Sequence, residues 1–488
     1  MAIKIPAKMC TQYMTRLKDH VFQRPRMKRI LDVEGDKDHR LILLNEQVQL
    51  SRGGVSSTLS AETSEEQVQV LGLSEELVAF ICSTQGVPQP YILKLGYEHL
   101  TVEEVLHKLL PPGSEVPSSF EQAGHIAHLN LRDEMLPFKH MIGQVILDKN
   151  PTLRTVVNKM GNIENEFRTF PMEVIAGQDD FDVTVRESGA KLAFNFRNVY
   201  WNSRLQTEHA RLIQILKSRA ANLLKNRNPE CLVVADMMAG VGPFAVPLAM
   251  HQMTNSSTAT GTGTGTGGGI VLHANDLNPE SHAALVKNSK VNRIQHGRLS
   301  SYNCDAREFV VNLVAKQVFF HEAIMNLPAN ATDFLDVFIG LETRYKRVMG
   351  ALAAESGEMT LPRIHVYGFS TAADPVADIA ARAASVLQCD ASLLELTPPP
   401  TPGEFDAMDT IPCWGHVVRD VSPKKLMVCL SFFLPRRVAL AEPIRFPFEG
   451  AGGAKRGTRE GGEEVAENIS GEMEDGDSSG GNKKSRVL

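Results

Sequence analysis

The sequence predicts an α/β fold whose largest domain is a mostly parallel, doubly wound sheet with helices on both faces. The first observation is that short apolar segments alternate with helical segments from residue 205 onward, which is the order of strands and crossover helices in a parallel sheet. The expected strands are CLVVAD, GIVLHAND, EAIMN, RIHVYGFS and KLMVCLSFFLP. The second observation is that the early strands end in Gly, Asp and Asn residues, which predicts a ligand site at the carboxyl ends of the strands.

The length of 488 residues predicts two to four domains, because it exceeds a single ordinary core. Residues 1–115 mix helical and strand patterns and are expected to form a small α+β N-terminal domain. Residues 120–200 have strand patterns, with a hairpin turn at Glu187-Ser188-Gly189, and predict a β-rich middle domain. A helical pattern starts at Leu205 and opens the sheet domain, which is predicted for residues 201–440.

Low-complexity segments separate or end these domains. Residues 254–269 are a Gly/Thr-rich insert without side chains to pack, and residues 398–410 are a Pro-rich loop. Residues 449–488 are expected to be a disordered, acidic, Gly-rich tail. This expectation rests on the eight acidic residues and nine glycines between Ala451 and Leu488.

Composition excludes several classes of protein. Hydrophobic content of 43% and charged content of 22% fit a soluble globular chain, and a net charge of -6 does not suggest a strongly basic polyanion binder. The seven cysteines are never closer than 16 residues, so neither a zinc ribbon nor a disulfide scaffold is expected, and no metal is predicted. Residues 232–250 are mostly apolar but contain Asp, Gly and Pro, so no membrane span is expected.

The first 29 residues carry eight Lys/Arg and one acid, Asp19. This pattern fits a mitochondrial presequence or a basic N-terminal helix. We expect the cytoplasm and nucleus as the location, with the mitochondrial matrix as an open alternative.

A Gly-rich turn, DMMAGVGP at residues 236–243, follows the first strand of the sheet domain and opens a helix. Gly240 and Gly242 would let a ligand approach the backbone, and the helix N-terminus offers free N–H groups. A tight turn without a ligand explains this pattern equally well. Ala245 replaces the third glycine of the dinucleotide fingerprint, so a dinucleotide is not favoured.

An acidic residue at the end of the next strand would hold ribose hydroxyls about 20 residues past the glycines. Asp276 lies 36 residues after Gly240, and 20 remain when the 16-residue insert is removed. Asp305 ends the third strand, beside the expected adenine position, although alone it could be a solvated helix cap. The three strand ends together predict a nucleoside-containing ligand.

The fourth strand ends in Asn326-Leu327-Pro328. A Rossmann-like sheet with one Gly-rich turn, acids after the second and third strands and Asn-Leu-Pro after the fourth has the layout of a class I methyltransferase that uses S-adenosyl-L-methionine. In that layout Asn326 presents its amide, with nearby backbone carbonyls, to the acceptor nitrogen. The alternative is that Asn326 caps the following helix, ATDFLDVFIGL.

Seven segments carry a resemblance to a known family over about residues 125–435. They are HLNLRDEMLPFKHMIGQVILDKNP, VVNKMGNIENEFRTFPMEVIAG, VRESGAKLAFNFRNVYWNSRLQTEHARLI, DMMAGVGPFAVPLA, ANDLNPES, MNLPANATDFLD and VRDVSPKKLMVCLSF. With them the chain resembles the archaeal and eukaryotic tRNA (guanine-37-N1)-methyltransferases. The resemblance implies an N-terminal domain that touches the outer corner of tRNA. It also implies a middle and a sheet domain that grip the anticodon stem-loop, and methylation of guanosine 37 on N1.

The resemblance also implies roles for individual residues. Glu208 would be the general base, Arg168 would stabilise charge on O6, and Asn326 would line the base pocket. The other substrate contacts would come from Tyr200, Arg204 and Pro328. The cofactor contacts would come from His209, Asp236, Ala239, Gly240, Gly242, Asp276, Leu277, Asp305, Ala306 and Asn326. Ala306 stands where the family often has Gly, and its small side chain should still allow a backbone contact to adenine.

The chemistry needs groups of these kinds. Guanine N1 carries a proton at neutral pH, which a carboxylate can accept, and the negative charge that develops on O6 suits an arginine. Glu208 could instead complement a helix dipole, and Arg168 could instead bind phosphate. Basic residues are frequent in the segment from 132 to 219, and Phe167, Tyr200 and Trp201 could stack on a base flipped out of the loop.

Three other functions stay open at this point. The related transferase of wybutosine synthesis moves the aminocarboxypropyl arm of the same cofactor, and Asn326-Leu327-Pro328 together with Glu208 favours methyl transfer over it. A non-catalytic tRNA-binding protein would show degraded motifs, which here look intact. A nicotinamide dehydrogenase would give the Asn-Leu-Pro segment no role. A monomer is the expected oligomeric state.

Overall fold

The computed structural model describes residues 1–24, 27–52, 68–117, 119–161, 167–225, 231–251, 269–350, 359–398 and 411–450. Nearly all of the Gly/Thr insert, most of the Pro-rich loop and the tail from residue 451 lie outside the described residues. The predictions made for those segments therefore stay predictions.

A seven-stranded sheet forms the largest domain and confirms the predicted fold class. Its strands are β13 (Cys231–Asp236), β14 (Gly269–Asn275), β15 (Leu299–Tyr302), β16 (Glu322–Met325), β17 (Arg363–Ser370), β18 (Cys413–Ser422) and β19 (Lys425–Phe433). The spatial order is β15-β14-β13-β16-β17-β19-β18. The first five strands of this order are parallel, and β19 and β18 are antiparallel. The order reverses at β13, and ligands of such sheets bind at the carboxyl ends of the strands beside that point.

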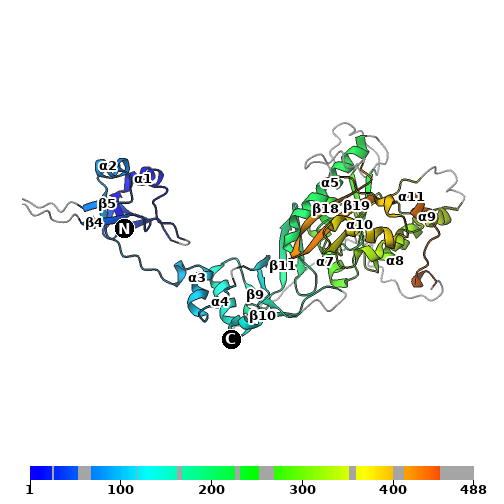
Figure 1. Cartoon of the computed structure of the whole chain (residues 1–488), viewed down its shortest axis with the longest axis horizontal. Helices are drawn as coiled ribbons and strands as arrows, with labels where there is room; N and C mark the ends of the chain where they lie inside the picture. Colours follow the sequence, from blue (N-terminus) through cyan, green and yellow to red (C-terminus); the bar gives the residue numbers. More distant parts are fainter. Residues whose placement is uncertain are drawn as a thin grey trace, which may run out of the picture. The chain divides into compact units, whose positions relative to one another are not determined.

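Helices cover both faces of this sheet (Figure 1). On one face lie α5 (Gln206–Lys225), α6 (Ala245–Ala249) and α7 (Pro279–Val291), whose apolar side chains join one cluster with β13 and β14. The other helices among the described residues from 201 onward are η4 (Ser203–Leu205), α8 (Ala306–Ala315), η5 (Ala331–Phe338), α9 (Leu341–Met349), α10 (Pro375–Val386), η7 (Ala391–Leu394), α11 (Arg436–Ala439) and η9 (Pro447–Gly450). Two successive residues of β17 point to opposite faces of the sheet. Tyr367 contacts Glu208 of α5 on one face. On the other face Gly368 lies against α10, where a Cβ on this glycine would be 2.4 Å from Ile379.

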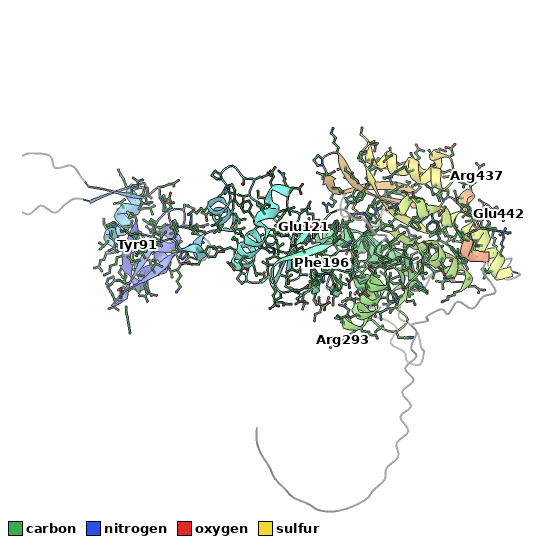
Figure 2. All side chains as sticks on the ribbon, turned by 90° about the horizontal axis from the view of Figure 1, so that it is seen from below. Tyr91, Glu121, Phe196, Arg293, Arg437 and Glu442 are labelled. Atoms are coloured by element: carbon green, nitrogen blue, oxygen red, sulfur yellow. The ribbon has the colours of Figure 1, made fainter. Side chains whose placement is uncertain are left out.

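A hairpin, β11 (Asp182–Glu187) and β12 (Ala190–Asn195), packs into the core of the sheet domain. Phe194 and Phe196 are buried in the cluster that also contains α5 and β13. Phe196 is labelled among the side chains of this part of the chain in Figure 2. Asn288 of α7 accepts a hydrogen bond from the Ala193 N–H at 2.7 Å. This backbone donor on the edge of the hairpin therefore has a side-chain partner. The predicted turn at Glu187-Ser188-Gly189 is confirmed. The hairpin shares its hydrophobic cluster with the sheet domain and also with Ala123, Ile126 and Val157 of the middle part.

The middle part combines a four-stranded sheet with two packed helices. Its elements are α3 (Val102–Leu109), β7 (Glu121–Ala123), β8 (Ile126–Leu129), η3 (Asp133–Phe138), α4 (Lys139–Lys149), β9 (Thr155–Lys159) and β10 (Met172–Gly177). Val105 and Leu106 of α3 share a hydrophobic cluster with Ile142 of α4. The core therefore groups α3 with the middle sheet, although the predicted boundary near residue 115 would separate them.

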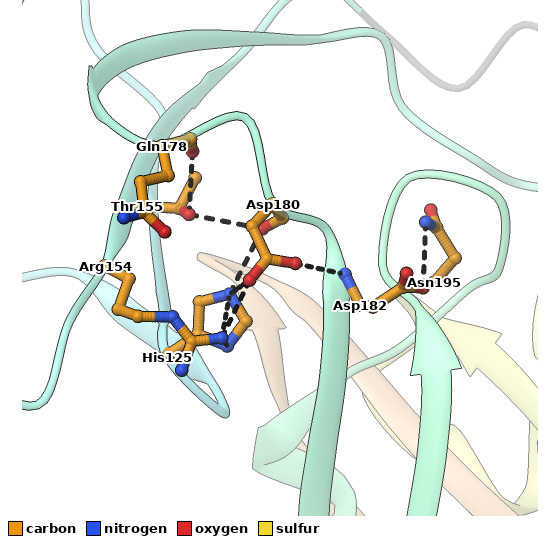
Figure 3. A network of polar contacts seen from close by, with 7 residues as sticks. All are labelled: His125, Arg154, Thr155, Gln178, Asp180, Asp182 and Asn195. Carbon is orange, nitrogen blue, oxygen red and sulfur yellow. Dashed lines mark hydrogen bonds and ion pairs between the residues drawn. The ribbon is translucent and has the colours of Figure 1, made fainter. Parts of the chain in front are cut away.

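A polar network joins the middle sheet to the hairpin (Figure 3). Arg154 donates to Asp180 Oδ2 at 2.7 Å, and the buried Thr155 hydroxyl donates to the carbonyls of Gln178 and Asp180. The other Asp180 oxygen accepts the Asp182 N–H at 3.1 Å, at the start of β11. The hydrogen bond from Arg154 is the main cause that lowers the pKa of Asp180, so this carboxylate stays charged.

The N-terminal part has its own core. Its elements are β1 (Ala2–Pro6), η1 (Ala7–Met9), α1 (Cys10–Arg16), β2 (Ile30–Val33), β3 (Asp36–Leu43), β4 (Gln49–Arg52), β5 (Val68–Leu71), α2 (Glu75–Ser83), β6 (Val87–Gln89) and η2 (Tyr97–His99). The strands β2-β3-β1-β6 form an antiparallel sheet, and Ile3, Ile5 and Tyr13 are buried in it. No helix within the described residues is long and apolar enough to span a membrane.

A buried ion pair ties α5 to the amino-terminal side of the large sheet. Glu322, at the start of β16, forms an ion pair with Arg219 of α5 at 2.5 Å and another with His365 of β17 at 3.0 Å. His365 also contacts the Ser431 hydroxyl at 2.8 Å. Burial alone would raise the pKa of Glu322, but Arg219 and then His365 more than offset this and lower it.

Removing this carboxylate should destabilise the protein strongly. Glu322→Ala would leave Arg219 buried without its counter-charge, which costs about 3–5 kcal/mol of the free energy of unfolding. The matched control is Glu442→Ala, which breaks an exposed pair with Arg347 and should cost about 0–1 kcal/mol. Urea unfolding followed by circular dichroism measures both, and equal midpoints for the two variants would contradict the expectation.

Candidate active site

A pocket opens at the carboxyl ends of the parallel strands, where the order of the sheet reverses. Nine residues predicted from the sequence line it together: Arg168, Tyr200, Gly240, Asp276, Leu277, Asp305, Ala306, Asn326 and Pro328. Phe167, which was predicted only as a stacking residue, lines it as well. Six further lining residues were not predicted as site residues: Met238, Asn275, Asn278, Ser281, Leu327 and Phe334. Residues from four strand ends and from the loop before β10 therefore meet at one place.

The buried amide of Asn275 holds three strand ends together. Its Nδ2 donates to the Met237 carbonyl at 3.1 Å and to the Cys304 carbonyl at 2.9 Å, while its Oδ1 accepts the Cys304 N–H at 3.1 Å. Its backbone carbonyl accepts the Ala239 N–H at 2.7 Å. The sequence places Asn275 beside Asp276, but its partners lie up to 38 residues away, so spacing alone gave it no role.

The two glycines of the turn have different functions. Gly240 has φ 55° and a Cβ there would meet no atom within 4 Å, so its backbone is open on that side. A Cβ on Gly242 would lie 2.6 Å from Val246 and 2.7 Å from Leu285, so this glycine allows close packing against α7. Gly240 lines the pocket and Gly242 does not.

Asp276 is tied directly to the Gly-rich turn. Its Oδ2 accepts the Gly240 N–H at 2.8 Å and its Oδ1 accepts the Asn278 N–H at 2.9 Å. Burial raises the pKa of Asp276, and these two backbone donors and Ser281 work in the opposite direction. The acid and the glycines that the insert separates in sequence are thus adjacent in the fold.

Asp305 caps a helix and also lines the pocket. It is the N-cap of α8, where its Oδ1 accepts the Arg307 N–H at 2.8 Å, and it also lines the pocket. Ala306 follows as the first helical residue and is buried. Arg307 turns away from the pocket to Asp336 at 2.8 Å and lies over the ring of Phe334.

Asn326 keeps a free acceptor. Its Oδ1 is buried and has no hydrogen-bond partner among the described residues. The helix that follows is η5, and its N-cap is Asn330, so Asn326 does not cap it. The carbonyls of Leu327 and Pro328 already accept backbone hydrogen bonds, from Ala331 and Phe369. The side-chain amide is therefore the group that this turn offers to a ligand.

Asp236 presents a buried acid below the Gly-rich turn. It is fully buried at the end of β13, and neither carboxylate oxygen has a hydrogen-bond partner of good geometry among the residues with described positions. Burial and then the charge of Asp276 raise the pKa of Asp236 to about 8. Asp236 does not line the pocket, so it can act on a ligand there only through its charge, from below the Gly-rich turn.

Arg168 and Tyr200 form the outer wall of the pocket. Arg168 has φ 59°, an uncommon backbone conformation for a residue other than glycine, and its guanidinium lies 5.6 Å from the Tyr200 ring centroid. Tyr200 is partly exposed, so its ring remains open to solvent. A cation and an open aromatic face at a pocket mouth suit a planar, electron-rich ligand.

Six predicted site residues do not line the pocket: Glu208, His209, Arg204, Asp236, Ala239 and Gly242. Arg204 pairs with Glu121 of β7 at 2.8 Å. His209 is buried, contacts Glu187 of the hairpin and packs edge-on against Phe244. The roles predicted for these residues stay predictions.

Glu208 is buried in the first turn of α5 and is fully hydrogen-bonded. Arg211 donates to both of its oxygens at 2.6 Å, and the Tyr367 hydroxyl donates to Oε1 at 2.7 Å. His416 Nε2 lies 3.5 Å from Oε2. Within the part of the chain that has described positions, no cluster of three or more His, Cys, Asp or Glu side chains could hold a metal.

Comparisons with known proteins agree with this geometry. The sequence profile of the TYW2 N-terminal domain matches residues 102–180, and that of the TRM5/TYW2 methyltransferase domain matches residues 183–346. A tRNA (guanine(37)-N(1))-methyltransferase of Phytophthora infestans is 39% identical over 445 residues, which is 90% of each chain. A human enzyme of the same name is 34% identical and covers 91% of this chain and 75% of its own length.

Solved structures support the fold. An aTrm5 determined in complex with tRNALeu has a TM-score of 0.54 at 17% identity and covers 89% of this chain and 99% of that chain. Trm5b from Pyrococcus abyssi has a TM-score of 0.50 at 20% identity and covers 88% and 98%.

The buried acid of the Gly-rich turn should couple cofactor binding to pH. Asp236 has a pKa of about 8, so it loses its proton as the pH rises through this value and then attracts the sulfonium of S-adenosylmethionine. The Kd of the wild type should therefore fall from pH 6.5 to pH 8.5. In Asp236→Asn it should stay flat and lie about 10-fold or more higher at the upper pH.

Calorimetric titration with S-adenosylmethionine measures this. Asp378→Asn, which changes an acid of α10 paired with Arg382, is the control and should follow the wild type. A pH dependence that persists unchanged in Asp236→Asn would contradict the prediction.

Proposed function

The chain belongs to the family of tRNA (guanine(37)-N(1))-methyltransferases. On that premise we propose which step of the reaction each of the candidate residues serves. The reaction transfers a methyl group from S-adenosyl-L-methionine to N1 of guanosine 37 in tRNA. The cofactor supplies the methyl group as a sulfonium, so the protein has to remove the proton on N1, stabilise the charge on O6 and hold the base.

The free acceptor of Asn326 is the observation that carries the assignment. Its buried Oδ1 lacks a partner among the described residues, and burying such an acceptor costs free energy unless a ligand supplies a donor. Guanine offers N–H donors on its Watson–Crick edge, at N1 and at the exocyclic amine. Adenine has no proton on N1, so this acceptor favours guanine at the target position.

Arg168 is proposed to contact the guanine at O6. Its guanidinium and the Tyr200 ring line the pocket that Asn326 also lines, so a base held between them would meet a cation at one edge and an acceptor at another. An arginine suits the O6 edge because its donors are planar and fixed. Tyr200 and Phe167 offer ring faces to a base that is flipped out of the anticodon loop.

Glu208 is proposed as the general base. It lies in the first turn of α5, and its carboxylate contacts Tyr367 of β17. The preceding residue of β17, Val366, pairs with Met325, directly before Asn326. The carboxylate is held by Arg211 and Tyr367, so it has to turn from at least one of these donors to accept the proton of N1. The same pocket would hold the cofactor through Gly240, Asp276 and Asp305.

Two properties outside the pocket are also proposed. We propose that the protein acts as a monomer without a membrane attachment, since nine of the predicted site residues come together in one pocket within one chain. We propose the cytoplasm and nucleus as its location, with the mitochondrial matrix as a further compartment because of the basic segment of residues 1–29.

Nucleoside mass spectrometry tests the reaction. The protein, S-adenosylmethionine and a tRNA transcript with guanosine at nucleotide 37 should give 1-methylguanosine, and a transcript with adenosine there should give no product. Glu208→Gln should lower the single-turnover rate by about 10²–10⁴-fold, because the base is lost. Glu280→Gln, which changes a first-turn acid of α7, is the matched control and should keep the rate.

A larger mass gain at nucleotide 37 would identify aminocarboxypropyl transfer instead. Retained tRNA binding without any modification would leave a binding protein. Either result would overturn the proposed reaction.

Loss of the guanidinium in the pocket should slow chemistry more than it weakens binding. Arg168→Ala should lower the single-turnover rate at saturating tRNA by about 10²–10³-fold, because charge on O6 loses its donor. Arg197→Ala is a matched control: Arg197 lies over the Phe181 ring at 3.7 Å, away from the pocket lining, and should keep the rate. If Arg168→Ala raised only the Kd for tRNA, Arg168 would be a phosphate contact.

A further inference from the structure

Glu208 lies at one end of a row of side chains that crosses three neighbouring strands. In the sheet, Tyr367 of β17 is paired with Cys429 of β19, and Cys429 is paired with His416 of β18. Residues directly opposite in antiparallel strands project from the same face, so these three side chains form a line. The line starts beside the turn of Asn326 and ends on β18, the edge strand of the sheet.

The carboxylate of Glu208 contacts this row along its length. The Tyr367 hydroxyl donates to Oε1 at 2.7 Å, and His416 Nε2 lies 3.5 Å from Oε2. Glu208 itself is only 4% exposed, whereas the side chain of His416 is 39% exposed. A proton taken up by the buried carboxylate therefore needs a partner that reaches solvent.

Most of the groups that face Glu208 cannot accept a proton at neutral pH. Burial disfavours the charged form of Arg211, but the hydrogen bonds to Glu208 raise its pKa, so it stays a cation. Burial raises the pKa of Tyr367 well above its ordinary value, and its hydroxyl remains a donor. Burial likewise raises the pKa of the Cys429 thiol to about 11, so it stays protonated.

His416 differs from these groups. Burial and then the positive charge of Arg211 lower its pKa, and the charge of Glu208 acts in the opposite direction. Its imidazole is therefore neutral at neutral pH and has a nitrogen able to accept a proton. Of the four groups described around Glu208, His416 alone combines an available lone pair with contact to water.

We propose that His416 takes over the proton that Glu208 removes from N1 of guanosine 37 and releases it to water. The N1–H bond breaks as an Oε–H bond forms on Glu208. The electron pair left on N1 forms the new bond to the methyl carbon, as the bond from that carbon to the sulfonium sulfur breaks and both of its electrons go to sulfur. The Oε–H bond then breaks as an Nε2–H bond forms on His416, and the imidazolium loses a proton to solvent. The inference rests on the proposed role of Glu208 as the base.

Arg211 and Tyr367 have a positioning role in this scheme. Their three donors fix the plane of the carboxylate, and that plane brings Oε2 toward His416. Neither residue exchanges a proton in the reaction. His416 acts through Glu208 and does not itself contact the guanine.

Chemical rescue separates a proton acceptor from a merely structural histidine. His416→Ala should lower the single-turnover rate of 1-methylguanosine formation by about 10-fold or more at pH 7, at saturating tRNA and cofactor. Added imidazole should restore the rate in proportion to the concentration of its free base. The Kd values for tRNA and S-adenosylmethionine should stay at wild-type levels. His416→Gln, close in size but unable to accept a proton at neutral pH, should be equally slow.

The control is His107→Ala on α3, which removes an exposed histidine whose Nε2 lies 3.7 Å from Glu103. This variant should keep the wild-type rate and show no response to imidazole.

The outcomes distinguish this inference from the proposed function. If Glu208→Gln is slow but both His416 variants keep the wild-type rate, His416 is not the acceptor and the inference fails alone. Slow His416 variants without imidazole rescue would also overturn it, because the histidine would then act through structure. If Glu208→Gln keeps the wild-type rate, Glu208 is not the base and both proposals fail together.

Discussion

One buried side chain, the amide of Asn275, sets the geometry on which the pocket depends. It bonds at once to the backbone that follows β13, through Met237, and to the backbone that follows β15, through Cys304. A parallel sheet orients its strands but does not fix the loops that leave them. Here a single amide uses its donors and its acceptor to fix three strand ends, and Asp276 and Asp305, each adjacent to one of these anchors, take their positions from it. A buried amide without hydrogen-bond partners would lower the free energy of unfolding. The loops therefore have to keep the conformation in which their backbone groups bond to Asn275.

Two buried polar groups without hydrogen-bond partners among the described residues lie close to the Gly-rich turn. They are the Asn326 oxygen and the Asp236 carboxylate, at the ends of the adjacent strands β16 and β13. Buried polar groups elsewhere, such as Thr155 of β9 and Asn288 of α7, are hydrogen-bonded, whereas Trp414 Nε1 is a group outside the pocket lining that is unsatisfied within the described part of the chain. In the proposed reaction Asn326 would accept from the neutral base, and Asp236, which does not line the pocket, would act on the cation through its charge.

Sequence patterns predicted the sheet, the hairpin and much of the pocket because these depend on local order. Strand ends recur at regular spacing, so Asp276 could be placed once the Gly/Thr insert was removed from the count. The alternative of a helix cap for Asn326 could not be settled in the same way, because it depends on where η5 begins. The hydrogen-bond partners of Glu208 could not be predicted from the sequence. Tyr367 is 159 residues away, and only the order of the strands brings it next to Glu208. The hairpin was recognised as such, but its grouping with the sheet domain is a matter of packing that strand patterns do not encode.

The position of β1 in the N-terminal sheet has a consequence for synthesis of the chain. This strand, Ala2–Pro6, is made before both of its neighbours in the sheet, β3 and β6, although it is an inner strand between them. The second neighbour, Val87–Gln89, is made more than 80 residues later. A nascent chain must therefore carry an apolar strand with an unpaired edge through several seconds of translation at about 5–20 residues per second. During this interval the strand can pair with another nascent chain, so the ribosome exit and the chaperones that act there are part of the environment in which this domain has to fold.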